Sequence, residues 1–406
     1  MREETIFPID IDYIVINDKV TIRIFGQTLS GERRLFYDDS FRPYCYILAN
    51  KNELIDHLSK FDFVTGIEEV EKSYLGRKIL VSKVYTKLPE DVPKLKNIGF
   101  KVYDADIPFY KRYILDKGIS TFSKIKVRLD GDYIKEIVSI EEGNPILNAI
   151  AFDIEVFSKR PFPDVKKDPI VIISLFNDKF KKIITWLNVY GDGIEKVNDE
   201  RELLLKFADL ITQYNPDVIV GYNSDNFDFP YINERAEILG VSLKFNGFGI
   251  KIKGTRKVAE INGKMHVDIF NFIRNIYAIY NLRTEVLDLN SVSSEMLGEK
   301  KDDFEWNKID DIMVDRDLAL KFCNYCLKDS MLTFRIYNKV LDLMVGINKY
   351  IGQSLQDVSR MTTGAVVENF LMKKFIEKNE VIPNKPSDFE VNERLKKVNI
   401  GAFVYQ

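Results

Sequence analysis

Apolar and polar positions alternate along the first third of the chain in a way that predicts mixed α and β structure. Strands are expected where apolar residues recur at every second position, and helices where they recur every three or four positions. The expected strands are residues 13–25, 41–48, 64–70, 78–85 and 124–129, and the expected helices are 51–61, 92–98 and 107–118. Residues 1–135 are therefore interpreted as one mixed α+β domain.

From residue 146 the pattern changes to short apolar runs separated by amphipathic segments. The expected order is strands 146–154, 170–176 and 182–187, helix 199–214, strand 217–222, helix 230–239 and a long helix 318–343. Asn262 and Gly263 form a two-residue hairpin signal between strands 257–261 and 264–267. This order is typical of a ribonuclease-H-like α/β domain, here placed at residues 136–344. Residues 345–385 read as helical and are expected to pack back on the first domain.

Composition and charge narrow the possible functions. The net charge of −3 means that any nucleic-acid binding must rely on local basic grooves or on metal bridges. Cys45, Cys323 and Cys326 make no disulfide framework and fit a reducing cytosol, so a cytoplasmic protein is expected. No apolar run is long enough to predict a membrane span. His57 and His266 leave almost no candidate base for a serine or cysteine triad, which favours carboxylate and metal chemistry.

Asp153 and Glu155 end the apolar run 146–154. Residues two apart in a strand share a face, so two carboxylates point to one place. Buried acids need a compensating positive charge, and carboxylate oxygens suit Mg²⁺ or Mn²⁺. The alternative is that both acids lie where a strand frays into solvent.

Two further motifs place polar groups after the fourth strand and on the last helix. Asn223, Phe227 and Asp228 follow strand 217–222, at the kind of strand-to-helix junction where α/β sheets bind ligands. Tyr325 and Asp329 are four residues apart and share one helix face. The alternatives are a helix cap at Asp228 and an ordinary amphipathic helix with a partly buried tyrosine.

Taken together, Asp-x-Glu, Asn-x-x-x-Phe-Asp and Tyr-x-x-x-Asp resemble, in order and spacing, the three exonuclease motifs of family B DNA polymerases. The resemblance implies a 3′–5′ proofreading exonuclease that hydrolyses phosphodiesters with two ions of Mg²⁺ or Mn²⁺. It implies that Asp153 bridges the ions, that Glu155 and Asp329 hold one of them and that Asp228 holds the other. Tyr325 is implied to orient the attacking water. The resemblance also implies a strand-separating hairpin at Asn262-Gly263.

Further stretches resemble the N-terminal domain of archaeal family B polymerases, namely Asp10 to Tyr13, Phe41 to Tyr44, Asp106 to Tyr113 and the late stretch from Asp357 through Pro386. In that family this domain captures template uracil in a pocket. The matching positions are Tyr13, Pro43, Tyr44, Val92, Ile107, Phe109 and Arg112. Aromatic and apolar walls can accept a flipped base. The alternative is that these residues form the core of the domain.

DNA, single-stranded or as a primer–template, is the expected partner. Asn223, Phe227 and Lys264 are the expected DNA contacts, with Arg256 and Lys257 near the base of the hairpin. The family's Ser-Leu-Tyr-Pro-Ser-like and Asp-Thr-Asp-like polymerase motifs do not occur, and residues 386–406 resemble only the start of a palm domain. Primer extension is therefore expected only with the missing part or with a second chain that carries palm, fingers and thumb. The alternatives are a non-catalytic template- or uracil-binding module, a replication scaffold, and a degradative nuclease of the same fold.

Overall fold

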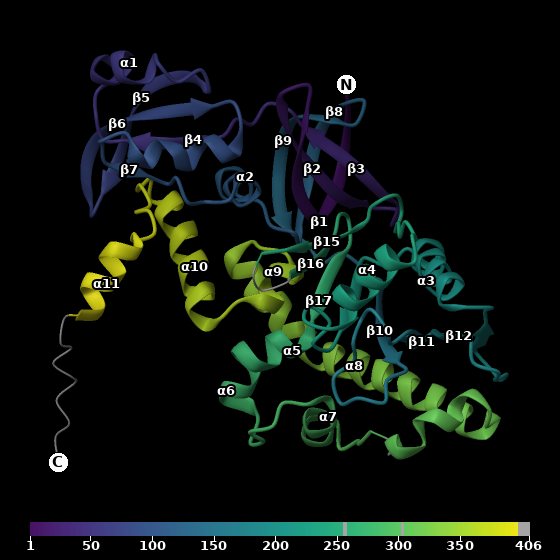
Figure 1. The fold of residues 1–406 in the computed structure, drawn as a ribbon. Helices are drawn as coiled ribbons and strands as arrows, with labels where there is room; N and C mark the ends of the chain where they lie inside the picture. The colour runs from purple at the N-terminus through teal and green to yellow at the C-terminus, as the bar shows by residue number, and fades with distance from the viewer. Residues whose placement is uncertain (255–257, 302–303, 397–406) are drawn as a thin grey trace. The chain divides into compact units, whose positions relative to one another are not determined.

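The computed structural model describes residues 1–254, 258–301 and 304–396 (Figure 1). Contacts divide the chain into two compact units. Unit 1 comprises Met1–Asp12, Arg23–Tyr37 and Gly118–Phe370, and unit 2 comprises Tyr13–Ile22, Asp38–Lys117 and the chain from Leu371 onward. The chain crosses between the units several times, so a single boundary at residue 135 does not describe the division.

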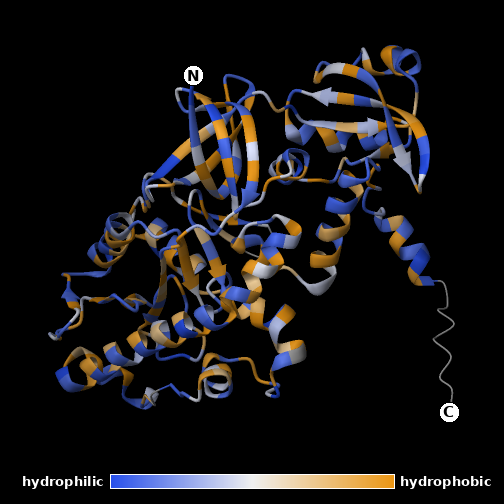
Figure 2. Ribbon diagram, turned by 180° about the vertical axis from the view of Figure 1, so that it is seen from behind, coloured by the Kyte–Doolittle hydropathy of each residue, from blue (hydrophilic) through white to orange (hydrophobic). Residues whose placement is uncertain are grey.

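Unit 1 contains most of a closed barrel, which the described strands form in the order β1-β2-β3-β9-β8. Its strands are β1 (Arg2–Ile16), β2 (Lys19–Thr28), β3 (Arg33–Asp38), β8 (Ser123–Asp130) and β9 (Tyr133–Glu142). Hydrophobic and hydrophilic residues alternate along them (Figure 2), and the inward side chains of Ile6, Ile22, Phe36 and Ile125 are fully buried. The expected single strand 13–25 is wrong, because Asn17 and Asp18 adopt φ values of 49° and 59° and turn the chain between β1 and β2.

The rest of unit 1 is built on a sheet whose described strands run in the order β13-β12-β11-β10-β14-β17. These strands are β10 (Ala149–Val156), β11 (Ile170–Asn177), β12 (Phe180–Thr185), β13 (Ile194–Lys196), β14 (Val218–Gly221) and β17 (Met265–Asp268). The central strand β10 pairs antiparallel with β11 and parallel with β14. This mixed sheet confirms the predicted ribonuclease-H-like α/β class.

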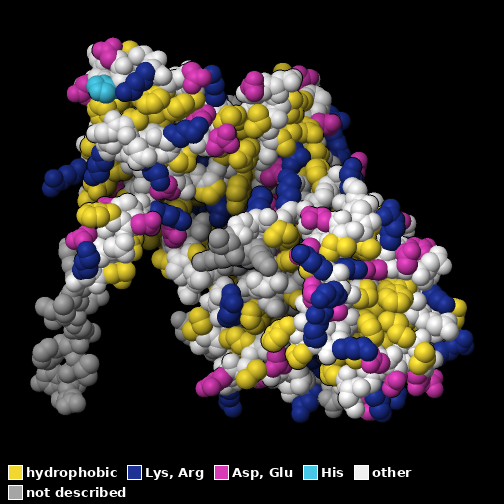
Figure 3. Space-filling model, in the orientation of Figure 1, with side chains coloured by type: hydrophobic (Ala, Val, Ile, Leu, Met, Phe, Trp, Pro, Cys, Tyr) yellow, Lys and Arg dark blue, Asp and Glu magenta, His cyan; other side chains and the backbone are white. Residues whose placement is uncertain are grey.

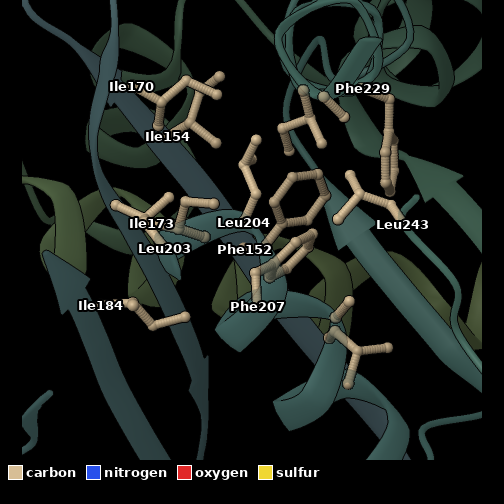
Figure 4. Close-up of a cluster of buried hydrophobic side chains, with 14 of the residues drawn as sticks. Phe152, Ile154, Ile170, Ile173, Ile184, Leu203, Leu204, Phe207, Phe229 and Leu243 are labelled. Carbon is tan, nitrogen blue, oxygen red and sulfur yellow. The ribbon is translucent and has the colours of Figure 1, made fainter. Parts of the chain in front are cut away.

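Helices cover both faces of this sheet. On one face, α3 (Glu200–Tyr214) and α4 (Asp228–Ile238) enclose a core in which Phe152, Phe207 and Phe229 meet (Figure 4). On the other face, the long helix α8 (Arg316–Ile351) packs with α5 (Ile269–Phe272) and α7 (Leu289–Leu297). The remaining elements of unit 1 are β15 (Ile250–Lys253), β16 (Val258–Ile261), a π-helical turn η2 (Ile273–Tyr277), α6 (Ala278–Asn281), a 3₁₀ helix η3 (Trp306–Met313) and α9 (Leu355–Arg360).

The α3 boundaries follow from local sequence. Asp199 caps the helix by accepting a hydrogen bond from the backbone N–H of Glu202 at 2.8 Å. Asn215 ends it in the left-handed region with φ 49°. The apolar stripe between them, with Leu203 and Phe207, is fully buried.

Unit 2 contains an antiparallel sheet in the order β5-β6-β4-β7. Its elements are β4 (Tyr44–Ile47), α1 (Lys51–Leu58), β5 (Val64–Tyr74), β6 (Arg77–Thr86), a 3₁₀ helix η1 (Pro89–Asn97), β7 (Val102–Tyr103), α2 (Phe109–Lys117) and α11 (Asp388–Lys396). Helix α10 (Thr363–Glu377) begins in unit 1 and ends in unit 2. Only the later part of the segment 345–385 packs on this sheet, where Glu380 bridges to Ser73 and Pro383 to Tyr103.

No described helix combines the length and hydropathy that a membrane-spanning segment requires. Residues 397–406 of the expected palm segment lie outside the described residues.

Candidate active site

Asp153 and Glu155 lie on the central strand β10 and face helix α8. Their neighbours Phe152 and Ile154 point to the opposite face, into the core beneath α3 and α4 (Figure 4). Carboxylate oxygens of both acids lie within 4.8 Å of each other and of the Sγ atom of Cys326 on α8. Asp153 and Glu155 therefore share one face of β10, as predicted. The strand does not fray at this point.

Tyr325 and Asp329 approach from α8, one helical turn apart. Asp329 is 4% exposed, and its Oδ2 atom is 2.5 Å from the Nζ atom of Lys301. That ammonium group also lies 4.7 Å from the centre of the Tyr325 ring. The ring packs in an aromatic cluster with Phe304 and Trp306 at 6.1 and 5.9 Å, which fixes its direction.

Asp228 completes the carboxylate set from the first turn of α4. It is 5% exposed, and its carboxylate accepts a hydrogen bond from the backbone N–H of Ile154, the residue between Asp153 and Glu155. The three sequence motifs therefore converge on one place on β10, as their order predicted.

The electrostatics of this cluster are dominated by crowded negative charge. Burial raises the pKa of Asp153 and Glu155 well above the ordinary carboxyl range, and the charges of Asp228 and Asp329 raise them further. Burial also raises the pKa of Asp228 to about 7. Lys301 opposes this effect as a nearby cation. The cluster therefore favours an added cation, and its oxygen donors fit a hard divalent ion such as Mg²⁺ or Mn²⁺.

Cys326 and Lys301 are two residues of this site that the motifs did not reveal. Cys326 Sγ lies 3.6 Å from Asp153 Oδ2 and 3.2 Å from Ser174 Oγ. Burial raises the pKa of the Cys326 thiol well above its usual value, so the group remains protonated and carries no charge. Lys301 is 28 residues before Asp329, and no local periodicity connects the two positions.

The loop that carries Asn223 and Asp228 is held by a buried polar network. Asp268 accepts hydrogen bonds from the backbone N–H groups of Asn223 and Asp225 at 2.9 and 3.0 Å. The Asp225 carboxylate accepts two hydrogen bonds from Arg360 of α9, at 2.7 and 2.9 Å. It also accepts one from the backbone N–H of Ala259 on β16, at 2.9 Å. One carboxylate therefore joins the loop to a helix and a strand that come later in the chain.

His266 belongs to the same network and not to a hydrolytic triad. Its Nε2 atom is 2.8 Å from Ser224 Oγ, and its Nδ1 atom is 3.4 Å from Asp225 Oδ1. All three residues are at most 2% exposed. Arg360 occupies both oxygens of Asp225, so this Ser-His-Asp arrangement is structural.

Two pockets open beside the carboxylates. Asp153, Asp329 and Asn223 line one of about 560 Å³. Glu155 and Phe227 line another of about 670 Å³. Asn223 and Phe227, both expected to contact DNA, thus line the pockets beside the carboxylate cluster.

Lys264, predicted to contact DNA from the tip of a hairpin, is buried in this structure and does not lie on an exposed tip. Lys264 is 4% exposed, and its Nζ atom donates to Asn215 Oδ1 at 2.5 Å. The predicted two-residue turn is present, with an antiparallel bridge between Ile261 and Lys264. The strands then diverge, because β16 pairs with β15, while β17 joins the central sheet beside β14. The turn at Asn262 and Gly263 connects these two sheets. Arg256 and Lys257 lie outside the described residues.

The residues matched to a uracil pocket all lie in unit 2. Tyr13 is 39% exposed and meets the buried ring of Phe109 edge to face at 5.4 Å. The Tyr44 hydroxyl donates a hydrogen bond to the Asp116 carboxylate at 2.6 Å. The guanidinium of Arg112 lies over the Tyr44 ring, 4.4 Å from the ring centre. Val92 packs in a hydrophobic cluster around α1, so the core interpretation fits Val92. Pro43 is buried and Ile107 is half-buried.

A mixed sheet with acids on its central strand, on the following loop and on the last long helix defines a ribonuclease-H-like nuclease domain. Comparison with known proteins agrees. Residues 100–292 match the family model for the DNA polymerase family B exonuclease domain.

The same comparison extends over nearly the whole chain. A DNA polymerase 1 of Pyrococcus abyssi is 33% identical over 414 residues, covering 98% of this chain and 50% of that protein. A DNA polymerase of Thermococcus gorgonarius is 32% identical, covering 95% and 49%. The structure of the family B DNA polymerase of Pyrobaculum calidifontis superimposes with a TM-score of 0.84 at 29% identity, covering 94% of this chain and 52% of that one. These matches confirm the resemblance to the N-terminal and exonuclease part of archaeal family B polymerases. The chain spans about half the length of these relatives.

The buried pair of Arg360 and Asp225 generates the first prediction. Arg360→Met leaves a buried carboxylate without its main partner and should lower the free energy of unfolding by about 3–5 kcal/mol. Because the two residues form one buried pair, their effects should not be additive. The double variant with Arg360→Met and Asp225→Asn should lose roughly 1–3 kcal/mol less unfolding free energy than the two single variants lose together. The measurement is denaturant unfolding followed by tryptophan fluorescence, since Trp186 and Trp306 both lie in unit 1.

The matched control is Arg160→Met, because the Arg160 side chain is 45% exposed in its pair with Asp168 at 2.8 Å and its loss should change stability by less than about 1 kcal/mol. Strictly additive effects of the Arg360 and Asp225 changes would contradict the assigned network.

Proposed function

We propose that this chain is a metal-dependent 3′–5′ DNA exonuclease, the proofreading part of a family B DNA-directed DNA polymerase in replication. The observation that carries this proposal is the convergence of Asp153, Glu155, Asp228 and Asp329 on one face of β10. These four carboxylates are buried together, and the nearby positive charge is too small to balance them. Such a cluster is the arrangement that a nuclease needs in order to bind two divalent ions. The family comparisons support the same activity.

The four carboxylates would hold the two ions. Bound divalent ions supply charge relief at the leaving oxygen and a more acidic water. The raised pKa values mean that the cluster without ions binds protons. Ion binding and proton release are therefore coupled in this chain.

The other side chains have separate tasks in this proposal. The Tyr325 hydroxyl stays protonated, because burial raises its pKa to about 12, so it can orient a water by hydrogen bonding. Lys301 fixes the carboxylate of Asp329. Asn223 and Phe227 line the pockets that would receive the terminal nucleotides.

DNA binding must come from local features such as these pocket residues and bound ions, and not from the overall charge of the chain. On the face drawn in Figure 3, Lys and Arg side chains are interspersed with Asp and Glu, in keeping with the net charge of −3. Primer extension would need the remaining polymerase part, in the same chain or in a second one, and remains a proposal.

Template reading is the second candidate function. It is favoured by the exposed Tyr13 beside Phe109, since an exposed aromatic ring on a buried one is a platform for a base. The two functions are compatible, because the residues of each lie in different units.

The exonuclease proposal predicts loss of activity when Asp153, the carboxylate proposed to bridge the two ions, is removed. With Mg²⁺ or Mn²⁺, the chain should shorten single-stranded DNA from the 3′ end faster than duplex DNA, because a paired end must melt first. Asp153→Ala should reduce turnover by roughly 100- to 1,000-fold or more. Tyr325→Phe should lower kcat by roughly 10- to 1,000-fold with little change in KM, because only one positioned hydroxyl is lost. End-labelled oligonucleotides resolved on a gel provide the measurement.

The matched controls are Asp192→Ala, an acid that is 85% exposed, and Tyr350→Phe, a tyrosine that is 69% exposed on the same helix α8. Both should keep full activity. Undiminished cleavage by Asp153→Ala, or full cleavage by the unchanged chain in EDTA, would rule out the proposed mechanism.

The template-reading candidate predicts a preference for uracil. Single-stranded DNA with deoxyuridine should bind more tightly than the thymine control, because a closed pocket excludes the methyl group. One methyl group limits the preference to roughly 10- to 200-fold. Fluorescence anisotropy in EDTA, which blocks degradation, measures both affinities.

Tyr13→Ala should abolish this preference, whereas Leu75→Ala, a 75% exposed control in unit 2, and Asp153→Ala should preserve it. Equal affinity of the unchanged chain for uracil and thymine would leave these residues as a hydrophobic core only.

A further inference from the structure

Unit 1 contains a further pocket that shares no lining residue with the two pockets at the carboxylates. Its volume is about 300 Å³, and its walls come from barrel strands β2 and β3, from the end of α3 and from the turn between β16 and β17. Roughly 300 Å³ is the lower limit for small-molecule sites. The pocket therefore suits one small ligand and not a polymer.

Asp217 is the acidic residue that lines this pocket, and its charge is already neutralised. Asp217 accepts hydrogen bonds from Arg33 Nε and Nη2 at 2.9 and 2.6 Å. Arg34 pairs with Glu4 at 2.8 Å and with Asp132 at 2.6 Å. A bound anion would therefore meet carboxylates whose charge arginines offset.

Lys264 adds a second positive charge beside Asp217, whose carboxylate is already paired with Arg33. It is 4% exposed, and its Nζ partner is the neutral amide oxygen of Asn215 at 2.5 Å. Among the ion pairs of the described residues none involves Lys264. Burial lowers the pKa of Lys264 to about 8, which leaves it mostly charged at neutral pH. A buried ammonium group whose hydrogen-bond partner is neutral and whose nearest carboxylate is already shared with an arginine is unfavourable, and an anion in the pocket would reduce that penalty.

The rest of the lining suits a flat ring with polar edges. The rings of Phe25 and Phe248 meet edge to face at 5.8 Å. The Arg23 guanidinium lies 5.4 Å from both ring centres and is itself held by Asp12 at 2.6 and 2.7 Å. The rings are thereby fixed before any ligand arrives. The exposed Asn246 also lines the pocket, where its amide can pair with a polar ring edge.

We propose that this pocket binds a mononucleotide, with the phosphate on Lys264 and the base against Phe25 and Phe248. An ammonium group binds phosphate as a point charge, aromatic rings provide a surface for any base, and amides can read its edges. The site is separate from the carboxylate cluster and does not require a metal ion.

Isothermal titration calorimetry of the full chain in EDTA tests this proposal. Deoxyadenosine monophosphate is the probe, and inorganic phosphate and deoxyadenosine are its two part-ligands. The monophosphate should bind more tightly than either part. Lys264→Gln should weaken it roughly 10- to 100-fold, the loss expected for one hydrogen bond to a charged group. Lys264→Arg, which keeps the charge, should retain most of the affinity.

Lys251→Gln is the matched control, because Lys251 is exposed on the neighbouring strand β15, and it should change nothing. Asp153→Ala should also bind normally, which separates this site from product binding at the carboxylates. Phe248→Leu provides an independent test if the Lys264 variants are poorly folded, because it should weaken the nucleotide but not inorganic phosphate.

Three results would overturn the proposal: no binding of the monophosphate, equal binding of deoxyadenosine, or an affinity that Lys264→Gln and Phe248→Leu both leave unchanged.

Discussion

The burial of several carboxylates beside one another is the constraint on which this structure depends. Charges of like sign in a poorly solvated site repel strongly, and each also loses its hydration. Lys301 offsets only part of this repulsion through its contact with Asp329. The remaining negative charge must be balanced by protons or by added cations, and this explains why the pKa values of Asp153, Glu155 and Asp228 are all raised.

A rigid frame is needed to hold such groups together. The pairing of β10 with β11 fixes Asp153 and Glu155, and β14 pairs with the start of the same strand. The network around Asp225 and Arg360 fixes the loop that positions Asp228. Arg360 is the last residue of α9, and α10 begins at Thr363. Helix α10 continues into unit 2 and so connects the two units. Only a few residues therefore separate α10 from Arg360, which holds the loop that carries Asp228. A change in α10 has a short covalent path to the site.

The sequence was sufficient for the parts that depend on local spacing. The period of two placed Asp153 and Glu155 on one face, and the helical period placed Tyr325 and Asp329 on another. It was insufficient where long-range pairing decides. The turn at Asn262 and Gly263 exists, with φ 79° at Gly263, but a local turn signal does not say which sheet each strand joins.

The misplacement of Lys264 has the same origin. A hairpin tip is normally solvated, but this turn connects two sheets, and the lysine is covered against Asn215, 49 residues earlier. Lys301 and Arg360 were missed because they meet their partners only in the folded chain. The division into two compact units also depends on long-range contacts, because β1 and β2 each contribute residues to both units.

The central claim is that the carboxylate cluster binds divalent ions in exchange for protons. Calorimetric titration of Mn²⁺ in two buffers of different ionisation enthalpy measures ion binding and proton release together. The account predicts binding near neutral pH with release of protons, and loss of both in Asp153→Ala. Absence of binding, or binding without proton release that persists in Asp153→Ala, would contradict it.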